Sequence, residues 1–160
     1  MKNTTLCYIK KDDKYLLLHR TKKKDDPNEG KWIGVGGHIE EGESPEECLL
    51  REVKEETNLT LTSYQYRALI TFVSDAYETE NMHLFTADAF EGELDYSCDE
   101  GELEWISKDA ILNLPMWEGD RKFLPLIMDE TTESFTMELI YRGDELVDCK
   151  YSINKYQIYN

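Results

Sequence analysis

The sequence predicts one α/β (α+β) domain spanning residues 1–160, with helices covering both faces of a central mixed β-sheet. Segments that alternate apolar and polar residues occur before, between and after helical segments, and most connections between them are short. A chain of 160 residues is long enough to bury a proper core. No internal repeat, low-complexity tract or linker divides it.

The strands follow from alternation and from the turn residues between them. Hairpins are predicted to turn at 12–13 and at 142–144. Trp105 is expected to be a residue of its strand that packs in the apolar core. The predicted strands are 3–10, 14–20, 32–35 (running into Gly36 and Gly37), 60–74, 82–90, 102–107, 134–141 and 145–153. Short helices are predicted at 108–112 and 120–128.

The longest predicted helix, 45–57, has clear signals at both ends. Ser44 is the expected N-cap, Pro45 occupies the first helical position, and Glu47 lies three residues after Ser44, which completes a capping box. Asn58 is the expected stop, because Asn tolerates the left-handed conformation that often ends a helix.

This helix carries three glutamates on one arc. At about 100° per residue, Glu52, Glu55 and Glu56 fall together, beside an apolar flank. Clustered carboxylates repel one another and raise each other's pKa, and oxygen-only ligands suit Mg²⁺ or Mn²⁺. The alternative interpretation is a solvated acidic face, which is what most charge runs are. The flank consists of Leu49, Leu50 and Val53.

The surrounding residues resemble a known motif. Residues 37–59 read Gly37, five residues, Glu43, seven residues, and then Arg51-Glu52-Val53-x-Glu55-Glu56-x-Asn58-Leu59. This pattern resembles the Nudix box, G-x5-E-x7-R-E-U-x-E-E-x-G-U, where U is apolar. Every defined position matches except Asn58, which stands where the family has Gly.

The Nudix resemblance implies an α/β/α sandwich and hydrolysis of nucleoside diphosphates linked to another moiety. It implies Mg²⁺, with Mn²⁺ as a substitute, because phosphoryl chemistry needs charge neutralisation and positioning. Arg51 would orient the glutamates, and Glu43 would support them. The implied catalytic residues are Glu43, Arg51, Glu52, Glu55 and Glu56, and the implied metal ligands are Glu52, Glu55, Glu56 and the Gly37 carbonyl.

A further carboxylate outside the box often joins the metal, or acts as the base, in MutT-type members. The segment 98–102 is the place to expect it, with Glu100 preferred and Glu102 second. The alternative is an acidic surface turn.

Two segments that flank the fold, 28–37 and 115–120, resemble the MutT/MutX group of 8-oxo-dGTP diphosphatases. The resemblance implies that Trp32 lies in the substrate-binding region, that Trp117 stacks on the purine and that Asp120 hydrogen-bonds the base edge. Trp117 as a lid or core residue and Asp120 as a helix N-cap are the alternatives. Ile33 stands in the substrate-binding region where some relatives have a base-binding Asn, which puts the substrate's identity in doubt.

The loop 20–31 is the most basic stretch of the chain. One interpretation is that Arg20 or a lysine such as Lys22 meets substrate phosphate. The other is a solvated loop.

Composition limits the partners. A net charge of −16 disfavours direct nucleic-acid binding, and allows a polyphosphate substrate only if divalent cations mediate the contact. The sequence has no apolar run of membrane-spanning length and no signal core, and its four scattered cysteines are read as reduced thiols. A cytoplasmic location is therefore expected, while the oligomeric state is not predicted.

The sequence thus predicts a Mg²⁺-dependent nucleoside triphosphate diphosphatase that releases a nucleoside monophosphate and pyrophosphate, with an oxidised purine dNTP such as 8-oxo-dGTP as substrate. One alternative is a Nudix hydrolase of another nucleoside diphosphate derivative, such as another NTP, a sugar nucleotide or a dinucleotide. The other is a non-catalytic nucleotide sensor.

Overall fold

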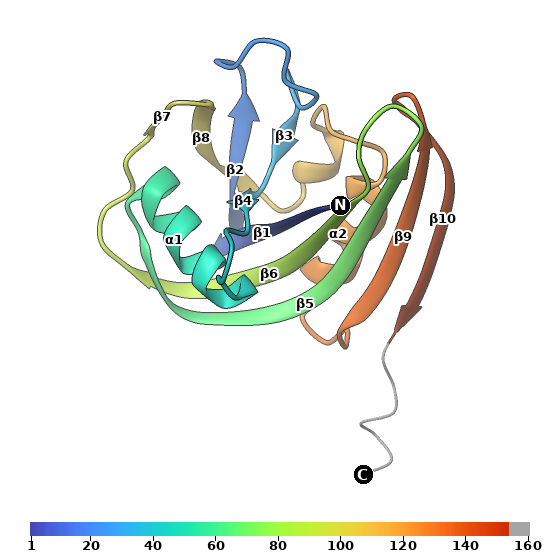
Figure 1. The fold of residues 1–160 in the computed structure, drawn as a ribbon. Helices are drawn as coiled ribbons and strands as arrows, with labels where there is room; N and C mark the ends of the chain where they lie inside the picture. Colours follow the sequence, from blue (N-terminus) through green and yellow to red (C-terminus); the bar gives the residue numbers. More distant parts are fainter. Residues whose placement is uncertain (154–160) are drawn as a thin grey trace.

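The computed structural model describes residues 1–153, which form one mixed sheet with a helix packed on each face (Figure 1). The strand order is β10-β9-β5-β6-β1-β2-β8-β7, with β3 paired to β2 and β4 paired to β1. The strands are β1 Lys2–Lys11, β2 Lys14–Arg20, β3 Trp32–Ile33, β4 Val35–His38, β5 Thr60–Ser74, β6 Glu80–Glu91, β7 Ser97–Cys98, β8 Gly101–Ser107, β9 Phe135–Arg142 and β10 Glu145–Ile153. The helices are α1 Pro45–Thr57, the 3₁₀ turn η1 Ile111–Asn113, and α2 Asp120–Met128.

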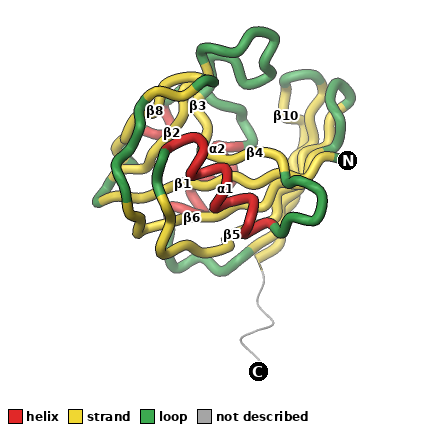
Figure 2. Tube along the Cα trace, turned by 60° about the vertical axis from the view of Figure 1, so that its left-hand side comes forward, coloured by secondary structure: helices red, strands yellow, loops and turns green. Residues whose placement is uncertain are grey.

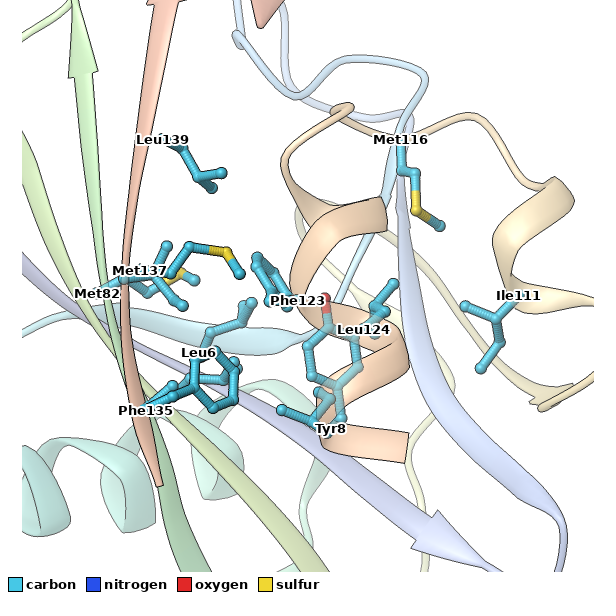
Figure 3. Packing of buried hydrophobic residues seen from close by; sticks show 14 of the residues in the cluster. Leu6, Tyr8, Met82, Ile111, Met116, Phe123, Leu124, Phe135, Met137 and Leu139 are labelled. Atoms are coloured by element: carbon cyan, nitrogen blue, oxygen red, sulfur yellow. The ribbon is translucent and has the colours of Figure 1, made fainter. Parts of the chain in front are cut away.

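The sheet separates two apolar cores because successive strand residues point to opposite faces. On β1, Leu6 and Tyr8 belong to the core under α2, and Cys7 and Ile9 belong to the core under α1. Figure 3 shows Phe123 and Leu124 of α2 pointing toward residues of the sheet. These two layers of helix confirm the predicted mixed sheet covered on both sides.

Helix α1 begins and ends where the sequence predicts. The Ser44 hydroxyl accepts the Glu47 N–H at 3.1 Å, and the Glu47 carboxylate accepts the Ser44 N–H at 3.0 Å. Asn58 adopts φ 66°, the left-handed conformation expected of the cap. Helix α1 packs on β1, β4 and β5, and Figure 2 shows it lying across one face of the sheet.

Two predicted segments and one predicted core residue differ from the structure. The strand 32–35 is two strands, because the chain leaves β2 at Ile33 and joins β1 at Val35. The predicted helix 108–112 is only the 3₁₀ turn η1, since Leu114 precedes a proline and is extended, with ψ 153°. Trp105 is half-buried and stacks on Phe90 at the margin of the α1-side core, rather than within it.

The far end of α2 is held by a buried cation. Arg67, only 2% exposed, donates to the carbonyl oxygens of Ile127 at 2.9 Å and Asp129 at 3.0 Å. These carbonyls lie at the helix C-terminus, where backbone acceptors lack helical partners. The contact fixes the C-terminal end of α2 on β5. No helix in the described residues 1–153 is long and apolar enough to cross a membrane.

Candidate active site

Helix α1 turns its acidic arc toward β4 and the loop that follows β4. The carboxylate of Glu56 accepts the backbone N–H of Gly36 at 3.0 Å, which ties the last turn of the helix to the strand. A Cβ atom at Gly37 would lie 2.6 Å from both carboxylate oxygens of Glu52. Only glycine therefore lets the Glu52 carboxylate rest against the backbone of β4.

Arg51 organises the acidic arc. Its guanidinium forms a bidentate pair with Glu43, at 2.8 and 2.9 Å, and donates to Glu52 at 2.8 Å and Glu55 at 3.3 Å. It also donates to the His38 carbonyl oxygen at 3.1 Å. Hydrogen bonding to Arg51 lowers the pKa of Glu43 to about 2, so this carboxylate is ionised. The contacts fit the orienting role that the box implies for Arg51.

The three box glutamates sit in different environments, which the sequence did not distinguish. Burial, then the charges of Glu100 and Glu52, raises the pKa of Glu56 to about 9. Burial also raises the pKa of Glu52, against the opposing effect of Arg51. Glu55 is 58% exposed. At neutral pH Glu56 therefore carries a proton in this arrangement, and an added cation would favour releasing it.

Glu100 reaches the same group from the turn between β7 and β8. Its charge raises the pKa of both Glu52 and Glu56, so the three carboxyls lie close enough to interact. Arg20 holds Glu100 at 2.9 Å and Asp26 at 2.8 Å. The structure thus brings the preferred extra carboxylate to the acidic arc, whereas Glu102 is exposed on β8 opposite His19.

The loop residues predicted to meet phosphate have protein partners. The Arg20 guanidinium is shared between Asp26 and Glu100, and Lys22 donates to the Cys98 carbonyl oxygen at 3.1 Å. These contacts favour a role for Arg20 in placing Glu100. Contact of Arg20 or Lys22 with substrate phosphate stays a prediction.

The donor set fits a hard divalent cation. It consists of carboxylate oxygens and a backbone carbonyl, and burial together with neighbouring carboxylates raises the pKa values of Glu52 and Glu56, which a bound cation would lower again. Within residues 1–153, no three Asp, Glu, His or Cys side chains already converge as a preformed metal-binding group. The fit therefore rests on donor chemistry and charge.

Cys48 is a neighbour of this site that the sequence did not single out. Its buried thiol lies 3.3 Å from the Thr5 hydroxyl, 3.7 Å from the Gly37 carbonyl oxygen and 3.5 Å from that of His38. Because Cys48 occupies a variable position of the box, no pattern in the sequence marked this contact.

A second group of predicted residues gathers on the α2 side of the sheet. Asp120, the first residue of α2, is 4% exposed, and burial, followed by the charge of Glu80, raises its pKa to about 7, against the opposing charges of Arg121 and Lys31. The N-cap of α2 is Gly119 and no side chain caps it, so the N-cap interpretation of Asp120 is wrong. The Asp120 N–H donates to the Trp117 carbonyl oxygen at 3.0 Å.

Trp117 is partly buried against the α2-side core, and it meets the loop 20–31 and strand β9. Its indole N–H donates to the Asn28 side-chain oxygen at 2.7 Å, and the Lys31 ammonium lies 4.4 Å from its ring centroid. The Tyr141 ring meets it edge-on, with centroids 5.3 Å apart. Sequence reasoning missed all three partners, which lie far from Trp117 along the chain.

Trp32 and Ile33 face opposite sides of the sheet. Trp32 packs on the α2-side core, stacks on His19 with centroids 4.4 Å apart, and donates its backbone N–H to Pro115 at 2.8 Å. Ile33 packs on the α1-side core. The structure therefore does not bring the Ile33 side chain together with Trp117 and Asp120, because alternation along β3 turns it away.

Comparisons with known proteins agree with this arrangement. A model of the NUDIX domain matches residues 2–127. The chain is 34% identical over 132 residues to YvcI of Bacillus subtilis (strain 168), an uncharacterized Nudix hydrolase, with 80% of each chain covered. It is 38% identical over 103 residues to the oxidized purine nucleoside triphosphate hydrolase of Danio rerio, covering 63% of this chain and 65% of that one.

Among solved structures, a MutT protein from Bacillus halodurans superposes with a TM-score of 0.84 at 29% identity. The superposition covers 94% of this chain and 97% of the MutT chain, so it extends well beyond the box. With the acidic arc on α1 and the mixed sheet between two helices, the match establishes the Nudix fold. The chain belongs to the Nudix family of hydrolases, which act on phosphoanhydride bonds.

Proposed function

We propose that this chain is a Mg²⁺-dependent nucleoside triphosphate diphosphatase that releases a nucleoside monophosphate and pyrophosphate. The observation that carries the proposal is the acidic arc held against β4, where Glu56 accepts the Gly36 N–H and the Glu52 carboxylate rests on Gly37, with the charge of Glu100 acting on both carboxyls. These carboxyls, in a chain of net charge −16, would repel a polyphosphate unless divalent cations lie between the carboxylates and the phosphates.

The residues that would hold the metal are Glu52, Glu55, Glu56, Glu100 and the Gly37 carbonyl. Bound Mg²⁺ supplies positive charge to the phosphate oxygens. The chain's own residues position the carboxylates: Arg51 holds Glu52 at 2.8 Å and Arg20 holds Glu100 at 2.9 Å. Fixed carboxylates matter because phosphoryl transfer depends chiefly on positioning and charge.

An oxidised purine dNTP, such as 8-oxo-dGTP, is the proposed substrate. Trp117 offers an aromatic surface and Asp120 a buried carboxyl. Trp117 precedes α2 and Asp120 is its first residue, so both lie on the α2 side of the sheet. The Danio rerio relative acts on oxidized purine nucleoside triphosphates, which supports this choice. With a pKa of about 7, Asp120 is able both to accept and to donate a hydrogen bond near neutral pH.

The function is tested with a panel of nucleotides at equal concentration: 8-oxo-dGTP, dGTP, dATP, ADP-ribose, a sugar nucleotide and a dinucleotide, each with Mg²⁺ and with EDTA. We expect Mg²⁺-dependent release of pyrophosphate from the triphosphates, with 8-oxo-dGTP used best. Preferred cleavage of ADP-ribose would contradict the triphosphate assignment and leave the hydrolase chemistry in place.

Ile33 favours a second candidate, a hydrolase of another nucleoside diphosphate derivative. Ile33 has no hydrogen-bonding group and faces away from Trp117, so base selection has fewer polar groups than in relatives with Asn there. A non-catalytic sensor is less favoured because every box glutamate is present. Nucleotide binding without turnover of any panel member would identify the sensor.

Mg²⁺ is expected to raise the melting temperature, because an ion that binds only the folded chain stabilises it by mass action. Glu52→Gln is expected to reduce the Mg²⁺-induced shift by at least half, since it removes a charged donor from the group. Thermal melting between 0 and about 10 mM Mg²⁺ measures the shift. Glu46→Gln, an exposed change on the same helix, is the control and should leave the shift intact. An unchanged shift in Glu52→Gln would place the ion elsewhere.

A further inference from the structure

Tyr141 links the C-terminal hairpin to the proposed base-binding residues. It lies on β9, beyond the residues 2–127 that match the family model, and is 6% exposed. Its hydroxyl oxygen accepts the Gly119 N–H at 2.7 Å, and its ring meets Trp117 at an interplanar angle of 82°. One side chain of the hairpin thus contacts both the indole and the turn that leads into α2.

The turn is seated tightly on this strand. A Cβ atom at Gly119 would lie 2.6 Å from the Tyr141 hydroxyl and 2.6 Å from a methyl carbon of Leu139. The ring of Phe72 on β5 is also stacked with the Tyr141 ring, at an interplanar angle of 27°. The phenol therefore has little freedom, and neither has the backbone that rests on it.

The hydroxyl also satisfies the backbone N–H of the N-cap residue of α2. Gly119 is the N-cap of α2 and has no side chain to satisfy nearby N–H groups. Asp120 follows at the next position, so the orientation of its buried carboxyl depends on the turn that Tyr141 holds. Burial, opposed by the Gly119 hydrogen bond, raises the pKa of Tyr141, so the phenol stays neutral.

We infer that Tyr141 is a positioning residue of the base-binding site, which sets the relative placement of the Trp117 ring and the Asp120 carboxyl through its hydroxyl. This inference rests on the proposed function, because it assumes that Trp117 and Asp120 contact the base. It assigns the hairpin a part in substrate recognition as well as in covering the α2-side core.

Tyr141→Phe tests the inference, because it removes the hydroxyl and keeps the ring. We expect the KM for the best triphosphate of the panel to rise about fivefold, the size expected from one lost hydrogen bond, while kcat changes less than twofold. Inorganic tripolyphosphate serves as a base-free competitive inhibitor, and its inhibition constant should not change. Tyr151→Phe, at a tyrosine 58% exposed on β10, is the matched control and should behave as the wild type.

Gly119→Ala provides a second variant that displaces the same turn from the helix side. It is expected to reproduce the rise in KM without a change in tripolyphosphate inhibition. An unchanged KM in both variants, with wild-type triphosphate hydrolysis intact, would overturn the inference and leave the proposed function standing. The inference would also be overturned if the inhibition constant of tripolyphosphate rose as much as the KM. The hydroxyl would then support the fold in general rather than the base-binding residues. A wild type that hydrolyses no triphosphate would remove the proposed function and the inference with it.

Discussion

Glu56→Gln is expected to lower kcat/KM by roughly 10²- to 10³-fold while the chain stays folded. Glu56 is half-buried, has a pKa raised to about 9, and accepts the Gly36 N–H at 3.0 Å. Glutamine resembles the protonated carboxyl in shape and still offers an oxygen to Gly36. What it cannot do is ionise to meet a cation, so the loss should fall on activity. Steady-state kinetics in saturating Mg²⁺ measure the effect.

Two further variants, one inside the acidic arc and one outside it, serve as comparisons for Glu56→Gln. Glu55→Gln changes a side chain that is 58% exposed, and it is also expected to lower activity by orders of magnitude without unfolding the chain. Glu46→Gln removes an exposed carboxylate from the same helix outside the acidic arc, and should retain normal turnover. Near-normal kcat/KM in Glu56→Gln would mean that this carboxyl holds no metal, and the assignment of the arc would fail.

Local signals in the sequence were enough to predict some elements to the residue. Helix α1 runs from Pro45 to Thr57 as predicted, because Ser44, Glu47 and Asn58 act on the backbone within a few residues of themselves. The box likewise brings Arg51 and Glu43 together through one loop and one helix. The position of α2 also follows from local pattern, although its buried end at Arg67 does not.

Contacts between distant segments were not predictable in the same way. The break between β3 and β4 depends on which neighbour each strand joins, and β7, Ser97–Cys98, is too short to leave a pattern. The interactions of Arg20 with Glu100 and of Trp117 with Asn28 join residues 80 and 89 positions apart. Only the folded sheet brings such partners together, so no pattern in the sequence marks the contact of Arg20 with Glu100 or that of Tyr141 with Trp117.

The second large effect is expected at Asp120, where the wild type should lose stability relative to Asp120→Asn as pH rises. Burial, then the charge of Glu80, raises the pKa of Asp120 from 3.8 to about 7, and Arg121 and Lys31 oppose the shift. In the unfolded chain the carboxyl ionises near its ordinary pKa. The stability that the protonated form confers is therefore fully present below pH 3.8 and is lost as pH rises through about 7.

A shift of this size corresponds to as much as about 4 kcal/mol, so the free energies of unfolding of wild type and Asp120→Asn should diverge between about pH 4 and pH 7. Chemical denaturation in EDTA measures the difference without a contribution from bound metal. The phenols of Tyr8 and Tyr141 also lie near Asp120, and burial keeps both neutral over this range. The exposed change Asp109→Asn is the control and should parallel the wild type at every pH.

Activity is expected to move in the opposite direction from stability. Asn keeps a hydrogen-bonding side chain at the start of α2 but cannot alternate between the accepting and the donating form of a carboxyl. Asp120→Asn should therefore discriminate less between bases, while its free energy of unfolding above pH 7 should exceed that of the wild type. A carboxyl that destabilises the fold at neutral pH, buried beside Trp117, is the pattern expected of a binding residue. If wild type and Asp120→Asn showed the same pH dependence of unfolding, ionisation of Asp120 would not destabilise the fold. The argument that Asp120 binds the base would then fail.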